Sequence, residues 1–282
     1  MSRVVGIQRV VRLRVIVVAA LAVGLWGPAS HARTWYIRAD GTGDAPTIQA
    51  AVDSATWGDV VLVGPGTHYL QGQHAIDIPP GVVVTSERGP SETIVQPTMV
   101  PTYGLFFLRN ESEVSGLWMK PVLVDNVDVV GAGARILNNI IELDEISECG
   151  VYVTERTTIT NNLIFGGSVG IRFGDCPQGT IVENNIILNG VDCQSCGFFY
   201  GGYCNVLRGA SVGWCVVGYD VDPQFCGMSG SENYFLQADS PCAPGHIEYC
   251  GLIGPLPVGC GTVATEESTW GAIKSLYQDN GR

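Results

Sequence analysis

Apolar and polar residues alternate in short segments through the middle of the chain, and these segments recur at a fixed spacing. Three of them contain an Asn-Asn pair followed by aliphatic residues, and the second Asn of each pair is Asn139, Asn162 or Asn185, 23 residues apart. Within each segment β-branched residues stand two apart, which is the period of a strand. A repeat of this length, made of short strands and polar turns, predicts a β-solenoid. Gly116 falls one repeat earlier in the same register.

Stacked coils of this kind would share apolar columns and a polar column. One coil cannot bury its own apolar face, so each must lie on the next. Asn tolerates left-handed backbone angles at turns, and stacked amides hydrogen-bond along the axis, so Asn139, Asn162 and Asn185 are expected to form a structural ladder. The expected apolar columns are Ile136, Ile159 and Val182, and Ile141, Ile164 and Ile187.

The residues before the repeats predict a helix that closes the first coil. Ile48, Ala51, Val52 and Ala55 share one face of a short helix, and Thr47 is its expected N-cap. An open coil end exposes unpaired strand edges and apolar side chains, so such a cover is needed. Strands separated by Pro and Gly turns are expected at 60–63, 76–78, 82–84 and 93–95.

Both ends of the chain differ in composition from the repeats. The first 32 residues contain four Arg, no acid and an apolar stretch of 12 residues at 15–26, which predicts a signal peptide cleaved before Arg33. An uncleaved membrane anchor is the alternative. Residues 226–260 contain four Cys and four Pro and predict a disulfide-rich cap over the other open end. The expected organisation is a signal peptide at 1–32, a right-handed parallel β-helix at 33–225, a cap at 226–263 and a tail at 264–282.

The cysteines predict an oxidising compartment. All ten lie at or after Cys149, and an even number in an exported chain suggests up to five disulfides. Zinc is the alternative for Cys193 and Cys196, although the second ligand pair that a structural zinc site usually has is missing. Spacing does not fix the pairing, and pairs between sequence neighbours are a hypothesis: Cys204–Cys215, Cys226–Cys242 and Cys250–Cys260.

Charge narrows the range of partners. The chain has 15 basic and 27 acidic residues, a net charge of −12, and residues 33–282 keep 11 of the basic ones, a net charge of −16. Such an acidic surface repels phosphate backbones, so we expect no nucleic-acid partner. No later stretch is long enough to span a membrane. We therefore expect a monomeric protein that is secreted or held at the cell surface.

Three parts of the sequence resemble known β-helix proteins. The stretch WYIRADGTGD at 35–44 and the stretch TIQAAVDSATWGDVVLVGPGTHY at 47–69 resemble the N-terminal part of right-handed parallel β-helix proteins of the pectin lyase-like superfamily. The Asn-Asn coils resemble the generic repeat of that superfamily. Residues 222–226, 240–245 and 250–260 are similar to the C-terminal part of secreted bacterial β-helix proteins of unknown activity. The resemblance implies the fold and leaves the function open, because this fold carries lyases, hydrolases, esterases, epimerases and adhesins.

The catalytic residue sets of those enzymes are missing, so no catalytic residue is assigned. The nearest approach to the hydrolase set is Gly245-His246-Ile247, which stands without the other parts. Pectate lyases of this fold hold calcium with clustered carboxylates, so calcium is the one cofactor to consider. The candidate cluster is Glu142, Asp144, Glu145 and Glu148, for which a solvated turn is the favoured interpretation.

Strand alternation predicts a recognition surface. Apolar residues at alternate positions of 150–153 and 170–173 should point inward, which leaves the residues between them facing outward on one stacked sheet. Aromatic rings pack on the C–H faces of sugars, and Arg pairs with carboxylates. The hypothesis is binding or processing of an extracellular polysaccharide, with a non-catalytic surface, adhesion or structural module as the alternative. The candidate residues are Phe106, Tyr152, Arg172 and Phe199.

Overall fold

The computed structural model describes residues 32–260 except 72–74, 99–103, 121–125, 146, 175–176, 194–195, 197–200, 210, 212–214 and 228–232. The chain divides into two units, Met1–Ala32 and Arg33–Arg282, and the fold below is that of the second. Residues 1–31 of the expected signal peptide, the expected tail and Phe199 lie outside the described residues.

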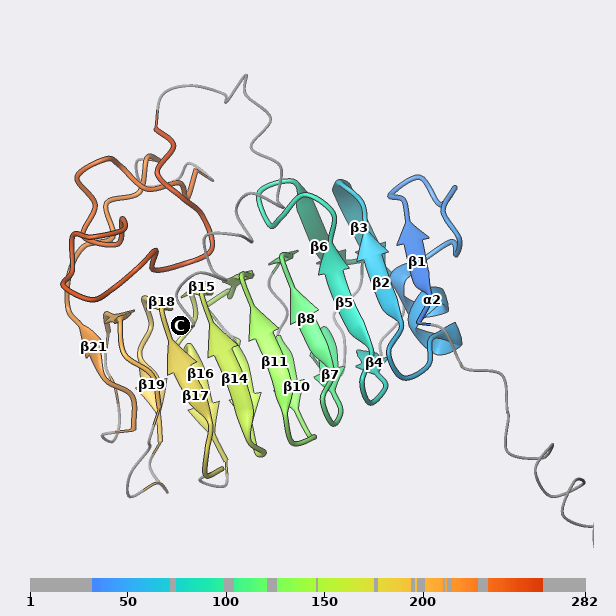
Figure 1. Ribbon diagram of the computed structural model, residues 1–282, viewed down its shortest axis with the longest axis horizontal. Coiled ribbons are helices and arrows are strands. Elements are labelled where there is room, and N and C mark those ends of the chain that lie inside the picture. The colour runs from blue at the N-terminus through green and yellow to red at the C-terminus, as the bar shows by residue number, and fades with distance from the viewer. Residues whose placement is uncertain are drawn as a thin grey trace, which may run out of the picture. The chain divides into compact units, whose positions relative to one another are not determined.

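The second unit is an all-β parallel solenoid of about seven turns, in which three sheets surround one interior (Figure 1). The central coils each add one strand to each sheet, and every strand pairs in parallel with strands of neighbouring coils, which confirms the predicted parallel β-helix. The seven-stranded sheet contains β1 (Thr34–Ile37), β2 (Val60–Val63), β5 (Val83–Ser86), β8 (Glu113–Ser115), β11 (Ala134–Leu137), β14 (Thr157–Thr160) and β17 (Ile181–Glu183). The six-stranded sheet contains β4 (Ile76–Ile78), β7 (Phe106–Leu108), β10 (Val127–Val129), β13 (Val151–Val153), β16 (Ile171–Phe173) and β19 (Val191–Asp192). The eight-stranded sheet contains β3 (Gly66–Leu70), β6 (Thr93–Pro97), β9 (Trp118–Met119), β12 (Ile140–Glu142), β15 (Leu163–Phe165), β18 (Ile186–Ile187), β20 (Asn205–Leu207) and β21 (Gly218–Tyr219).

The predicted helix closes the first coil. Helix α2 (Ile48–Ser54) begins after Thr47, whose hydroxyl accepts the backbone N–H of Ala50 at 3.1 Å. Its apolar face is buried in the interior of the solenoid beside β1 and β2, where Figure 1 shows it in blue. The outer edge of β1 is also occupied, because Asp44 pairs with both backbone polar groups of Tyr36. The N-terminal end therefore presents little open strand edge to solvent.

The two predicted apolar columns line two sides of the interior. Successive members of each column are paired in register on neighbouring strands. None is more than 1% exposed, which confirms that the Asn-marked segments coil above one another around a dry interior. The columns are Ile136, Ile159 and Val182 on the seven-stranded sheet, and Ile141, Ile164 and Ile187 on the eight-stranded sheet.

The two asparagines of each Asn-Asn pair have different structural roles at the turn between these two sheets. The first Asn of each pair adopts the left-handed conformation, with φ of 56–57° at Asn138, Asn161 and Asn184. The second Asn is fully buried, and its side chain hydrogen-bonds to the next coil. Strand pairing places Gly116, with φ 69°, opposite Asn138 and not opposite Asn139. The predicted register of Gly116 was therefore wrong by one residue, because that coil is one residue shorter.

The Cys-rich segment lies along the side of the solenoid. The eight-stranded sheet carries a second, outward-facing apolar column, here called the outer stripe, whose members are paired in register and at most 4% exposed. Residues 233–260, here called the strap, cover this stripe with apolar side chains that include Leu236, Leu252 and Ile253. Figure 1 shows the strap in orange and red beside β15 and β18. The outer stripe consists of Trp118, Ile140, Leu163, Ile186 and Val206.

Hydrogen bonds and ring contacts fix the strap on the coils. The side-chain amide of Asn161 donates to the carbonyl of Leu252 at 2.9 Å, and the N–H of Gly254 donates to the carbonyl of Asn184 at 2.7 Å. The ring of Tyr234 meets that of Trp118 edge-on, with centroids 5.6 Å apart. The prediction that this segment covers the open end therefore needs correction: its described residues pack on a sheet face.

The disulfides follow the three-dimensional path of the chain and not its order. The structure contains Cys193–Cys215, Cys204–Cys250 and Cys226–Cys260, so the three pairs proposed between sequence neighbours were wrong. The first lies in the interior at the C-terminal end of the solenoid, and it removes Cys193 from the set of thiolates that could bind zinc. The second joins the strap to Cys204, which lies directly before β20. Stacking of coils, which spacing does not reveal, brings these residues together.

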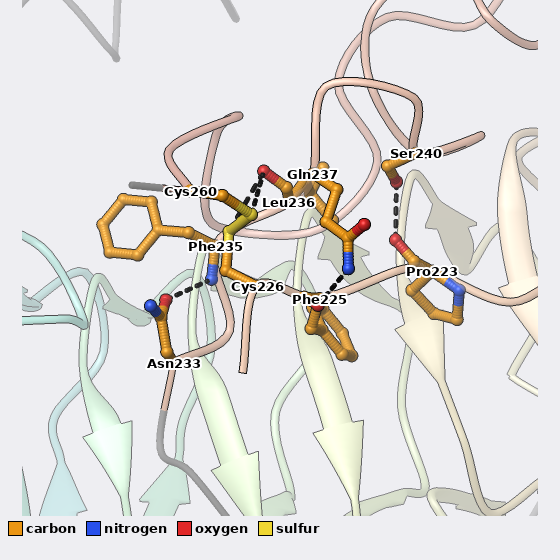
Figure 2. The surroundings of a disulfide bond; sticks show 9 residues. All are labelled: Pro223, Phe225, Cys226, Asn233, Phe235, Leu236, Gln237, Ser240 and Cys260. Atoms are coloured by element: carbon orange, nitrogen blue, oxygen red, sulfur yellow. Dashed lines mark hydrogen bonds between the residues drawn. A yellow bond between two sulfur atoms is a disulfide. The ribbon is translucent and has the colours of Figure 1, made fainter. Parts of the chain in front are cut away.

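The third disulfide joins Cys226, which precedes the strap, to Cys260 at the end of the strap (Figure 2). Around it, the side chains of Gln237 and Ser240 donate hydrogen bonds to the carbonyls of Phe225 and Pro223, at 2.8 and 2.6 Å. Cys242 keeps a free thiol inside the strap, where burial raises its pKa to about 11. A thiol of this kind is inert toward exchange while the strap is closed.

Candidate functional site

The six-stranded sheet carries one outward side chain per coil in a single register, a set here called the recognition column. Strand pairing places each member directly beside the next. Neighbouring strands lie about 4.8 Å apart, so the column presents a side chain at that interval along the solenoid axis. Its members are Asp77, Phe107, Asp128, Tyr152, Arg172 and Asp192.

The local sequence explains why these side chains point outward. In five of the six strands the column residue lies between two apolar residues that are at most 4% exposed, as in Val127-Asp128-Val129. The column residues are half-buried or exposed. Alternation along a strand makes this arrangement unavoidable once the apolar residues enter the interior.

Of the four residues predicted for this surface, two lie together on it. Tyr152 and Arg172 are neighbours in the column, as the alternation predicted. Phe106 does not face outward: it is fully buried and paired with Val127, and Phe107 occupies the outward position. Sequence analysis missed the three Asp residues and Phe107, although Ile-Asp-Ile at 76–78 and Val-Asp-Val at 127–129 show the same alternation.

Ion pairs organise both ends of the column. Arg109 donates from Nε and Nη2 to the two carboxylate oxygens of Asp77, at 2.7 and 2.6 Å. Donation of these hydrogen bonds to the Asp77 carboxylate raises the pKa of Arg109. Arg172 lies between two carboxylates, 3.4 Å from Asp192 and 3.8 Å from Glu148. The column and its immediate partners thus contain four carboxylates and two guanidinium groups, and each guanidinium is engaged by a carboxylate.

The ring of Tyr152 occupies space that a glycine leaves open. A Cβ atom placed on Gly174, just after β16, would lie 2.5 Å from the Tyr152 hydroxyl oxygen. The backbone N–H of Gly174 donates to the carbonyl of Val153 at 2.9 Å, which holds the two coils in register at this point. The absence of a side chain at Gly174 therefore leaves room for the ring of Tyr152.

Of the four carboxylates considered for calcium, Glu142 and Asp144 are engaged by different neighbouring side chains. Oε2 of Glu142 accepts Nε1–H of Trp118 and the ammonium of Lys120, each at 3.0 Å. Asp144 accepts the hydroxyl of Ser147 at 2.8 Å. In the part of the chain that the structure describes, no three His, Cys, Asp or Glu side chains converge as metal ligands would. The residues present do not fit the calcium site considered from the sequence.

The fold defines the class of this protein as a parallel β-helix with a disulfide-linked strap. Comparison of the chain with protein-family models, curated proteins and solved structures found no match. The resemblance to the pectin lyase-like superfamily thus remains an expectation from the sequence. Among the described residues, no helix has the length and apolar character needed to cross a membrane.

Proposed function

We propose that the protein acts outside the cell and binds an extended polysaccharide along the recognition column. The observation that carries this proposal is the in-register line of six outward side chains, which includes the rings of Phe107 and Tyr152. Disulfides such as Cys204–Cys250 are typical of proteins in oxidising compartments, and this supports an extracellular location.

The chemistry of the column suits a sugar chain. Aromatic rings pack on the C–H faces of sugar rings, while carboxylates and guanidinium groups hydrogen-bond to sugar hydroxyls. Since one side chain stands about every 4.8 Å, a ligand lying along the axis would contact several coils at once. A globular ligand would reach fewer members of the column.

The ion pairs of the recognition column support binding of the polysaccharide without its chemical turnover. Arg109 and Arg172 are both held by carboxylates and are charged donors in this arrangement. The pairing of Arg109 raises its pKa further, which works against any role as a proton acceptor. We therefore assign these residues to orientation of the ligand.

A glycan array tests the proposal with the full chain and its disulfides intact. The unchanged protein should bind at least one polysaccharide, and Tyr152→Ala should weaken that binding at least about fivefold, as expected for loss of one aromatic contact. Tyr249→Ala is the matched control, since Tyr249 is 95% exposed on the strap. Absence of binding to every glycan would overturn the proposal and favour a structural or adhesion module.

Turnover is measured in parallel on the ligands that bind. Incubation with uronans, with and without calcium, followed by ultraviolet absorbance of unsaturated products, detects lyase activity. We expect no product. Product formation that depends on the recognition column would replace binding by catalysis as the function of this surface.

A further inference from the structure

Three successive coils place a carboxylate between two aromatic rings at the centre of the recognition column. Asp128 is paired in register with Phe107 on one side and with Tyr152 on the other. All three side chains are half-buried on the outer face of the six-stranded sheet. Each ring therefore stands on a strand that lies about 4.8 Å along the solenoid axis from the strand of Asp128.

We infer that this triad binds a protonated amine, and that the polysaccharide recognised by the column carries free amino sugars. The inference rests on the proposed function. An ammonium group donates a charge-assisted hydrogen bond to a carboxylate and is attracted electrostatically to the faces of flanking rings. A carboxylate offers about four acceptor positions, so Asp128 can accept an ammonium alongside its other contacts.

The charge around the triad selects against the other ligand classes. Four carboxylates and two guanidinium groups lie in or beside the column, and the whole chain carries a net charge of −12. This potential attracts a polycation and repels a polyuronate. A neutral or N-acetylated sugar lacks the positive charge of an ammonium, so it cannot form the same charge-assisted hydrogen bond to Asp128.

Titration calorimetry with three oligosaccharides of equal length tests the inference on the full, disulfide-intact chain. The probes are a hexamer of β-1,4-linked glucosamine, its fully N-acetylated counterpart and a hexamer of galacturonate. The amino hexamer should bind at least about tenfold more tightly than either of the others. Its affinity should fall with added salt and with alkaline pH, as charges are screened and the amines lose their protons.

Two variants test whether the triad causes the preference for the amino hexamer. Asp128→Asn should reduce the preference for the amino hexamer over the acetylated one by about tenfold. Phe107→Leu keeps the apolar volume but removes the ring, and should reduce the same preference by about threefold. Asp239→Asn, an exposed carboxylate on the strap, is the matched control and should leave the preference unchanged.

The outcomes separate this inference from the proposed function. Equal or tighter binding of the acetylated or uronate hexamer overturns the inference and leaves polysaccharide binding in place. An unchanged preference in both Asp128→Asn and Phe107→Leu also overturns it. Binding to none of the hexamers and to no glycan on the array overturns both.

Discussion

A single side-chain oxygen of Asn185 accepts two hydrogen bonds from Asn162, one from its backbone N–H at 2.9 Å and one from Nδ2 at 3.0 Å. Asn162 does the same for Asn139, at 2.9 and 3.2 Å. Asn205 extends the ladder at the shorter spacing of 20 residues, and Leu117 begins it by donating its N–H to Asn139. Each rung thus satisfies buried backbone groups of the coil before it.

Asn162→Ala should lower the free energy of unfolding by about 2–4 kcal/mol. The substitution leaves the buried N–H of Asn139 without its acceptor and the carbonyl of Ile136 without its donor, and each unsatisfied buried group costs about 1–3 kcal/mol. Urea unfolding followed by circular dichroism measures the loss.

The first Asn of another Asn-Asn pair provides the control. Asn184→Gly keeps a residue that adopts the left-handed conformation freely, so the change should stay within about 1 kcal/mol. Equal losses in the two variants would show that the ladder contributes nothing beyond turn geometry.

Leu163→Ala should destabilise the protein by about 2–4 kcal/mol, although Leu163 lies on the outside of its sheet. The strap buries this side chain completely, so truncation leaves a cavity as it would in an interior. Thr158→Ala, at an outward position of β14 without such a cover, should change the stability by less than about 0.5 kcal/mol. Similar small effects in both would mean that the strap does not pack on the stripe in solution.

Replacement of both Cys204 and Cys250 by Ala should loosen the strap and cost about 2–4 kcal/mol. The thiol of Cys242 reports the opening, because it is fully buried and its pKa is raised to about 11. Peptide mapping after iodoacetamide treatment should show modification at this position at least about tenfold faster in the double variant. An unchanged rate would show that the other contacts hold the strap without this disulfide.

The repeat made the fold predictable, because its period states directly which residues stack. The sequence analysis overlooked one feature of the repeat. Each Asn-Asn pair is followed by two apolar residues, such as Ile140 and Ile141, and only one of two adjacent strand residues can point inward. The second apolar residue therefore requires a cover on the outside of the sheet. That requirement is readable from the sequence, but the identity of the covering segment is not.

The candidate site was predictable only in part. Phe106 and Phe107 are adjacent and chemically alike, so the register that pairs Phe106 with Val127 decides which ring faces solvent. The predicted disulfide pairs were wrong for a related reason, since Cys204 lies beside Cys250 only because the strap folds back over the coils. Contacts within a coil follow the repeat, whereas contacts between the strap and the coils depend on the path of a segment that has no repeat.

Asp59 should make the stability of the first coils depend on pH. Its carboxylate accepts the backbone N–H groups of Arg33 and Thr56, at 2.7 and 2.9 Å, and the bond from Arg33 is the main cause of a pKa below the ordinary 3.8. A depressed pKa means that this stabilisation is present above about pH 4 and is lost as the pH falls through the folded-state value.

Asp59→Asn should therefore cost about 1–2 kcal/mol at pH 7, and the difference from the unchanged protein should shrink as the pH falls below 3.8. Urea midpoints at pH 7, 5 and 3 measure it, with the exposed Asp239→Asn as control. A difference that is constant over this range would contradict the assignment.

Gly174→Ala should weaken ligand binding without unfolding the protein. The added Cβ would lie 2.5 Å from the Tyr152 hydroxyl oxygen, and the far end of that ring can move, so the ring shifts while the coil stays intact. We expect glycan affinity to fall about fivefold, with a loss of stability below about 1 kcal/mol. The same substitution made in a Tyr152→Ala background should have no further effect on affinity, because the two changes act through one ring. Additive losses would show that Gly174 affects binding through something other than the Tyr152 ring.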